Sequence, residues 1–434
     1  MTTQMYICLA LFILLIAGYV FSSKLRISTG VIALCATLLT VWLKLLPAKA
    51  VLSNFSNSNV LLIAGMFIVS AGFNRTQAVN KVSEALHNIS GGNFTIVLAG
   101  YLAVSFLLGS LLPSAVAAIA ITAPLLAASC YKANVSPSKV MFSLGLVAIS
   151  AMGVLPIGGA VTQFATQNGY LESYGYMEYQ MQLIDPFKGR FIGALIVAIY
   201  ALLIGPKLAP AQPSVPIADD EKSKGGPKKE PLDPVREVLG YSLFILTTIG
   251  LMFASKLGLE EWQVAMTGAA LVTVTGVISP KEATKAIPFR VLLMLIAALT
   301  VGSAMVECGL GDLIGDSIAS AMGGTRNGYI IGAVFFVIPF LLTQVMQNRS
   351  VKNIFTPIVI LTCKSLGCNP IGPLLLLASA CQAGYLTPNA SATVPLIMSV
   401  GGYDQKDLFK MGWLPALIMS VASVVVIMSI FPTY

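Results

Sequence analysis

The sequence contains little charge, one histidine and no paired cysteines. Charged residues make up 10% of the 434 residues, against about 25% in an average soluble domain. The single histidine, His87, has no second histidine or cysteine nearby, and the seven cysteines include no Cys-x-x-Cys pair. No catalytic pair of the Asp/Asp, His/Glu or Ser/His kind is evident in the apolar segments. We therefore expect neither an enzyme nor a protein with a bound metal or organic cofactor.

Acidic residues are absent from the middle of every long apolar run. All 18 of them fall in expected loops, in surface helices or near the ends of apolar runs. A proton relay through a buried carboxylate is therefore not expected. The net charge of +8 is not read as a nucleic-acid signal, because basic residues in membrane proteins mark orientation. The expected surroundings are a lipid bilayer, with no nucleic-acid partner.

Long apolar runs dominate what the sequence does contain. Hydrophobic residues make up 56% of the chain, which predicts an all-α polytopic membrane protein. Hydropathy predicts about ten transmembrane helices. Their ranges are 5–22, 27–46, 59–73, 138–155, 190–205, 238–255, 262–279, 289–305, 371–386 and 411–431.

Two further apolar blocks, 93–131 and 326–365, are each interrupted near the centre. The first interruption, 112–116, contains nothing that requires water, so a solvent loop describes it poorly. We predict a re-entrant hairpin buried in protein at membrane depth. We predict the same kind of hairpin at the second interruption, 347–352, because the repeat described next matches it to the first.

An internal repeat relates the two halves of the chain at a nearly constant spacing of about 230 residues. A surface helix near residues 79–89 carries basic residues, whereas its counterpart near 310–318 carries acidic ones, which predicts an inverted-topology repeat. The matched positions are Val60-Leu61-Leu62 with Val291-Leu292-Leu293, Gly91-Gly92 with Gly323-Gly324, Pro124 with Pro357, and Pro137 with Pro370.

The distribution of lysine and arginine predicts orientation. With both termini outside, basic residues on the inner side clearly outnumber those outside. The proline-rich segment 206–237 is then a cytoplasmic linker between the halves. In this count Lys188 and Arg190 belong to an outer loop before the span that begins at 190.

Two broken helices are predicted at matched positions, each after an interrupted block. They lie at 155–163 and 385–393, where proline or glycine occurs with hydroxyl and amide side chains in apolar surroundings. Unwound backbone offers carbonyl oxygens to a small cation and helix N-termini to an anion. A simple kink satisfied by neighbouring helices is the alternative for either break alone.

Arg349 and Lys352 are the only charged residues between Asn327 and Cys363. A cation in such surroundings is costly unless it faces a cavity and meets an anion. We predict that Arg349, or Lys352 one turn later, supplies the positive charge that faces an anionic substrate. Neutralising a helix C-terminus or reaching to an interface is the competing interpretation for each residue.

Short motifs occur in a fixed order along nearly the whole chain. They are Phe55-Ser56-Asn57 before 62–67, Ser136-Pro137-Ser138-Lys139 before a span, Pro156-Ile157-Gly158-Gly159, Thr387-Pro388-Asn389, and Gly401-Gly402-Tyr403 before Asp407-Leu408. In their order and spacing, more than in any one of them, these motifs resemble the divalent anion/sodium symporter family of the ion transporter superfamily.

This resemblance implies a homodimer in which a transport domain moves against a scaffold domain in an elevator-like motion. The scaffold would comprise 1–92 and 238–325, and the transport domain 93–205 and 326–434. The family's hairpin tips carry Ser-Asn-Thr or Asn-Asn-Thr, whereas this chain has Ser114-Ala115-Val116 and Gln347-Asn348-Arg349.

The resemblance also implies a substrate site between the two tips and sodium as the possible coupling ion. The substrate candidates are Ser114, Ala115, Gly159, Thr162, Gln347, Asn348, Arg349, Ser350, Lys352, Pro388, Asn389 and Ser391. The sodium candidates are Ser110, Ser114, Gly158, Asn348, Thr387 and Ala390.

The sequence as a whole predicts a secondary active transporter of small organic anions, of the di- or tricarboxylate kind. It would work as a sodium-coupled carrier or as an exchanger, in the inner membrane of a bacterium or archaeon. A carrier of another anion, such as a sulfonate, sulfate or other oxyanion, remains open. An anion channel is the alternative of a different class, and would be expected to carry a basic pore ring.

Overall fold

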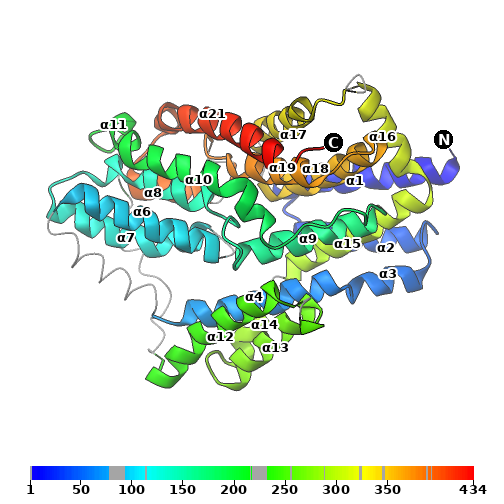
Figure 1. The fold of residues 1–434 in the computed structure, drawn as a ribbon, viewed down its shortest axis with the longest axis horizontal. Helices are drawn as coiled ribbons and strands as arrows, with labels where there is room; N and C mark the ends of the chain where they lie inside the picture. Colours follow the sequence, from blue (N-terminus) through cyan, green and yellow to red (C-terminus); the bar gives the residue numbers. More distant parts are fainter. Residues whose placement is uncertain are drawn as a thin grey trace.

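The computed structural model describes residues 2–77, 93–112, 115–215, 217, 232–254, 257–287, 289–321, 325–344, 348–387, 390–391 and 393–434. The regular secondary structure of these residues is entirely helical (Figure 1). The predicted all-α class is therefore confirmed.

The first half of the chain begins with long apolar helices and ends in a short helix before the linker. Its elements are α1 (Thr3–Leu25), α2 (Thr29–Trp42), α3 (Ala48–Phe55), α4 (Ser58–Arg75), α6 (Phe94–Leu111), α7 (Ala115–Lys132), the 3-10 helix η1 (Pro137–Lys139), α8 (Met141–Ser150), α9 (Gly159–Ser173), α10 (Asp185–Leu203) and α11 (Gly205–Leu208).

The second half repeats this order. Its elements are α12 (Pro234–Met252), α13 (Glu261–Val274), α14 (Pro280–Ala286), α15 (Phe289–Glu307), α16 (Leu310–Ala321), α17 (Gly328–Thr343), α18 (Asn348–Leu366), α19 (Ile371–Gln382), α20 (Thr393–Gly401) and α21 (Gln405–Ile430).

Helix packing follows the predicted repeat. Helix α4 packs along α13, and their counterparts α15 and α2 pack along each other in the same way. Likewise α6 packs on α8, and α17 packs on α19. Helices α10 and α21, which occupy equivalent places in the two halves, lie against each other. The two halves are thus interleaved within one bundle, so residues far apart in the sequence are brought together at its centre.

Both interrupted apolar blocks form helical hairpins, α6 with α7 and α17 with α18. The two hairpins start with the same cap. The side chain of Asn93 accepts a hydrogen bond from the backbone N–H of Thr95 at 3.0 Å, and Asn327 accepts one from Tyr329 at 3.0 Å. An asparagine at this position satisfies an N–H group that the helix leaves unpaired.

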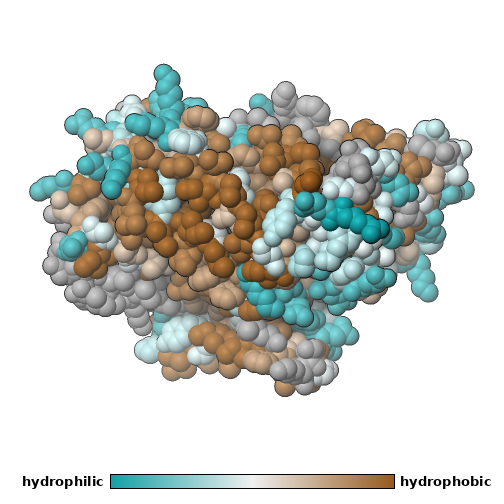
Figure 2. Space-filling view, turned by 45° about the horizontal axis from the view of Figure 1, so that its top comes forward, coloured by the Kyte–Doolittle hydropathy of each residue, from teal (hydrophilic) through white to brown (hydrophobic). Residues whose placement is uncertain are grey.

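The surface carries the apolar stripes expected of a membrane protein. On the face shown in Figure 2, hydrophobic side chains form a broad continuous area with hydrophilic residues grouped at its margins. Along α21, Trp413, Leu417, Val421 and Val425 are exposed at a spacing of four residues, which places them on one helix face. Such a face is stable against lipid and unfavourable against water.

Helices of membrane-spanning length and composition are fewer than the sequence predicts. Among the described residues they are Ala48–Phe73, which joins α3 and α4, together with Phe94–Leu111, Asp185–Leu203 and Gln405–Ile430. Other apolar helices are shorter, such as Met141–Ser150 and Ile371–Gln382. The two named here are short because each stops at a break, so their apolar runs are divided between two elements.

Two element boundaries differ from those predicted. Helix α10 begins at Asp185, five residues before the predicted span, so Arg190 lies inside a helix and not in a loop. The linker ends earlier than 237, because Asp233 caps α12 by accepting a hydrogen bond from Arg236 N–H. At its other end, Ser214 N–H donates to Gly402 O at 2.8 Å. The surface helix expected near 79–89 lies outside the described residues.

Candidate functional site

The first helix break lies between α8 and α9, and the end of α6 in the first hairpin packs against it. Gly158 in this break has φ +50°, and a Cβ atom there would lie 2.0 Å from the carbonyl oxygen of Leu111. Ser110 Oγ donates a 2.8 Å hydrogen bond to Ala151 O in the same break. The structure therefore brings the predicted residues Ser110, Gly158 and Gly159 together.

The second break follows α19, and the second hairpin tip is bonded to it. The N–H of Asn348 donates to Ala390 O at 3.1 Å, and Thr343 Oγ1 donates to Asn348 Oδ1 at 2.5 Å. Thr387 Oγ1 donates to the carbonyl oxygen of Gln344. The predicted residues Asn348, Thr387 and Ala390 thus form one cluster.

Gln344 is a member of this cluster that the sequence analysis did not single out. Its Nε2 donates to Ala383 O at 3.2 Å, and its Oε1 accepts from Leu386 N–H at 3.2 Å. One amide therefore satisfies two backbone groups that the break leaves unpaired. The available signal was an isolated amide in an apolar run, one turn before the predicted tip.

The two breaks meet at the centre of the molecule. Gln382 Nε2, at the C-terminal end of α19, donates a 2.8 Å hydrogen bond to Met152 O in the first break. Gln382 Oε1 is buried and has no hydrogen-bond partner among the described residues. Since α19 and α8 are equivalent in the two halves, this bond joins corresponding points of the repeat.

A buried arginine lies beside this junction. Arg190 of α10 is only 3% exposed. Its Nε donates to Ser379 Oγ at 3.2 Å, and its Nη1 donates to Gly153 O at 3.3 Å and to Gln163 Oε1 at 3.2 Å. The guanidinium therefore connects α10 with α19, α9 and the first break. Every acceptor it meets is neutral.

The sequence did not identify Arg190 as a buried site residue, because hydropathy places the end of a span at the first charged residues. A signal was nevertheless present five residues earlier. The pair Asp185-Pro186 is typical of a helix start, since proline is favoured in the first turn and an acidic residue favours the N-terminus. Starting the helix there would have placed Arg190 in its second turn, inside the bundle.

The two cations predicted at the second tip lie in different environments. Arg349 is exposed in the first turn of α18, whereas Lys352, one turn later, is half-buried. The positive charges of Arg190 and Arg349 both act unfavourably on that of Lys352. Among the described residues, the salt bridges of the chain involve neither Arg190 nor Lys352. Within the described part of the chain, Arg190 and Lys352 thus have no carboxylate as a salt-bridge partner.

Other predicted residues are placed as follows. Ala115 is buried at the start of α7, Thr162 is half-buried in the first turn of α9, and Ser391 is half-buried with its Oγ unpartnered among the described residues. The backbone of Ser350 lies in α18. Ser114, Gln347, Pro388 and Asn389 lie outside the described residues.

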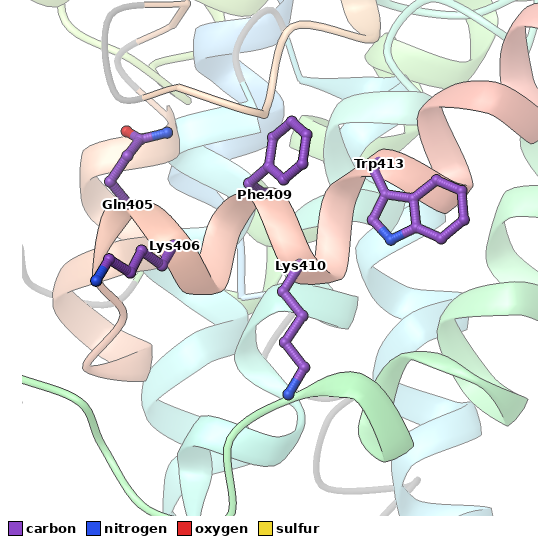
Figure 3. Close-up of a pocket in the computed structure, with 5 residues that line it drawn as sticks. All are labelled: Gln405, Lys406, Phe409, Lys410 and Trp413. Atoms are coloured by element: carbon purple, nitrogen blue, oxygen red, sulfur yellow. The ribbon is translucent and has the colours of Figure 1, made fainter.

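A surface hollow of about 540 Å³ lies on one face of α21 (Figure 3). It is lined by Gln405, Lys406, Phe409, Lys410 and Trp413, all from that helix. Aromatic and lysine side chains of this kind are typical of a membrane–water interface. The hollow is open and lies on a single helix, whereas the two breaks are enclosed by several, so we place the functional site at the breaks.

Solved structures establish the fold class. The chain is similar to the YdaH transporter of Alcanivorax borkumensis, with a TM-score of 0.63 and 14% identity over 87% of this chain and 86% of that one. The fold shared with that structure is a bundle of apolar helices in which two hairpins fold onto two helix breaks.

The sequence then gives the family. The sequence model of the citrate transporter family matches residues 9–348 and, separately, 251–433. The chain belongs to the citrate transporter family. The prediction of a transporter and not an enzyme is thereby confirmed.

Relatives of known sequence agree with this assignment. The chain is 23% identical over 424 residues to the sodium-dependent dicarboxylate transporter SdcS of Staphylococcus aureus, covering 89% of this chain and 79% of that protein. It is 24% identical over 207 residues to an uncharacterized transporter of Synechocystis, where the match spans 47% of this chain but only 33% of that protein. The resemblance to sodium-coupled anion carriers seen in the motifs is confirmed at the level of the superfamily.

Proposed function

We propose that this protein is a secondary active transporter of small organic anions, of the di- or tricarboxylate kind, that works by alternating access. The observation that carries the proposal is the meeting of two matched hairpin tips and two matched helix breaks, joined by the bond from Gln382 to Met152. Broken helices at a repeat interface offer helix ends and free carbonyls to a substrate held between the halves.

The charge of the site favours an anion. The positive charges of Arg190 and Arg349 both act on that of Lys352, and neither Arg190 nor Lys352 forms a salt bridge with a described carboxylate. Buried cations without counter-ions are costly, and a bound anion removes that cost. An anion channel would need a basic pore ring open to both sides, whereas the bonds from Ser110 to Ala151 and from Asn348 to Ala390 support hairpins that close on the breaks.

The movement is inferred from the repeat. The interleaved contacts of the two halves support an inverted-topology repeat, with two re-entrant hairpins and two broken helices. We assign 1–92 and 238–325 to a scaffold and 93–205 and 326–434 to a transport domain that moves as an elevator, in a homodimer. We place both termini outside and the linker between α11 and α12 in the cytoplasm of a bacterium or archaeon.

Sodium is the proposed coupling ion, with one site at each tip. The first would use Ser110 and the backbone at Gly158, and the second would use Asn348, Thr387 and the backbone at Ala390. These groups offer neutral oxygen atoms, which suit a hard cation. The printed name of SdcS, a sodium-dependent dicarboxylate transporter, supports this coupling. Exchange of one anion for another is the second mode, favoured by the fixed charges at the centre.

The test is uptake into proteoliposomes. Labelled mono-, di- and tricarboxylates, sulfonates and sulfate are offered in turn under an inward sodium gradient, an inward proton gradient, or with unlabelled anion trapped inside. We expect saturable uptake of a di- or tricarboxylate that is stimulated by sodium or by trapped anion. Uptake of sulfate or a sulfonate alone would move the function to another anion, and no uptake under any gradient would reject transport.

A further inference from the structure

Arg190 is held by three of its neighbours and still has an unused nitrogen. Its Nε and Nη1 donate to Ser379, Gly153 and Gln163, but Nη2 is buried and has no hydrogen-bond partner among the described residues. A buried donor without an acceptor destabilises the fold, and more so when it is charged. The fold therefore keeps an arginine in a place where the protein does not fully satisfy it.

The neighbouring amides are also incompletely used. Gln163 Oε1 accepts from Arg190, which fixes the orientation of that amide, and its Nε2 is buried without a partner among the described residues. Gln167 lies one turn further along α9, is 0% exposed, and has neither amide atom paired within the described part of the chain. The unused donors, Nη2 of Arg190 and Nε2 of Gln163, thus belong to two side chains that are hydrogen-bonded to each other.

The charge balance of this cluster points to a ligand with a negative charge. Arg190 and Lys352 act on each other as like charges, and Cys381 is the other ionisable group that acts on both. No salt bridge of the described residues reaches either cation. A neutral ligand could satisfy the hydrogen bonds, but only an anion also offsets the two positive charges.

We infer that a carboxylate group binds between Arg190 Nη2 and Gln163 Nε2, with Lys352 as the second positive charge. A carboxylate matches this pair because its two oxygens can accept from the two unused donors of side chains that already contact each other. The inference rests on the proposed function for the identity of the carboxylate as the transported substrate. It moves the anchoring group from the exposed Arg349 to a buried residue of α10.

The test uses a variant that supplies its own carboxylate. Gln163→Glu places a carboxylate where Oε1 already lies 3.2 Å from Arg190 Nη1. We expect this variant to have a higher Tm than the wild type in the absence of ligand, since the buried charge is now paired. We also expect its affinity for added carboxylates to fall at least about tenfold, because the site is occupied.

The assay is thermal unfolding of the purified full-length protein in detergent and chloride-free buffer, titrated with acetate, succinate, citrate or chloride. The wild type should rise in Tm with a carboxylate in a saturable way. Arg190→Lys, which keeps the charge but loses the fork of donors, should weaken this response at least about tenfold. Arg326→Gln, which removes an exposed cation outside the cluster, should leave it unchanged.

Three results would overturn the inference. They are an unchanged carboxylate response in Gln163→Glu, an unchanged response in Arg190→Lys, and a wild-type shift that chloride produces fully with no further effect of carboxylates. Uptake by wild-type proteoliposomes separates the two proposals. Binding that Gln163→Glu abolishes in a protein without transport would keep the carboxylate site and reject the transport function. Transport by the wild type, together with unaltered carboxylate binding in Gln163→Glu, would keep the transport function and reject the carboxylate site.

Discussion

The side-chain amide of Gln382 donates a 2.8 Å hydrogen bond to the backbone carbonyl of Met152. Gln382 ends α19 and Met152 follows α8, and these two helices occupy equivalent places in the two halves of the chain. The bond therefore ties one helix break to the start of the other. A substrate bound at this point would contact both halves at once.

Removing this bond should destabilise the protein and impair transport. In Gln382→Leu the Met152 carbonyl loses its donor in a buried site, which should lower the free energy of unfolding by about 1–3 kcal/mol. Thermal unfolding and initial uptake rates measure the two effects. The matched control is Gln405→Leu, which loses a 2.7 Å bond to Leu386 O in an exposed setting and should change stability less. Equal losses in both variants would contradict the central role of Gln382.

Close contact between the first tip and its break should make Gly158 irreplaceable. In Gly158→Ala the added Cβ would lie 2.0 Å from Leu111 O, so the hairpin tip has to move. Gly367 also has a positive φ, +62°, but has nothing within 4 Å of an added Cβ. We expect Gly367→Ala to cost about 1–2 kcal/mol of backbone strain and to keep transport. Gly158→Ala should abolish uptake, and uptake at the wild-type rate would disprove the contact.

Arg349 at the second tip should contribute to substrate attraction. Arg349→Gln removes an exposed positive charge in the first turn of α18, beside Lys352. We expect at least a tenfold loss of uptake, about 1.4 kcal/mol, with an unchanged Tm. Arg326→Gln, an exposed arginine before α17, is the control and should retain uptake. Full uptake by Arg349→Gln would leave Arg190 and Lys352 as the relevant cations.

The hydroxyl of Thr387 should affect the dependence on sodium. Its Oγ1 donates to Gln344 O and keeps lone pairs for a cation. Thr387→Val should raise the sodium concentration for half-maximal uptake by about tenfold or more. Thr273→Val is the matched control, since Thr273 Oγ1 also bonds a backbone carbonyl, that of Ala269, but on α13. An unchanged sodium dependence in Thr387→Val would remove the second tip from the cation sites.

Much of this architecture is predictable from the sequence because it depends on local composition. Apolar runs predict helices, and proline or glycine within them predicts the breaks at Gly158 and Thr387. The position of the second hairpin tip follows from its match with the first. These features depend on residues close together in the chain or on the repeat.

The remainder depends on contacts that no local pattern encodes. Arg190 and Gln163 belong to different helices, and the bond between them exists only because α10 packs against α8 and α19, beside the first break. Hydropathy also misleads at helix ends, where a charge such as Arg190 ends the predicted span although the helix begins at Asp185. Gln344 was overlooked because one polar residue hardly changes the mean hydropathy of a span.

Counterflow tests the central claim most directly. Proteoliposomes are loaded with an unlabelled di- or tricarboxylate that screening has identified, diluted into the labelled anion at trace concentration, and sampled over time. A carrier that alternates between two faces should accumulate label transiently above the outside concentration, and Gly158→Ala should not. Label that only equilibrates, at a rate that loading does not change, would indicate a channel and contradict the account.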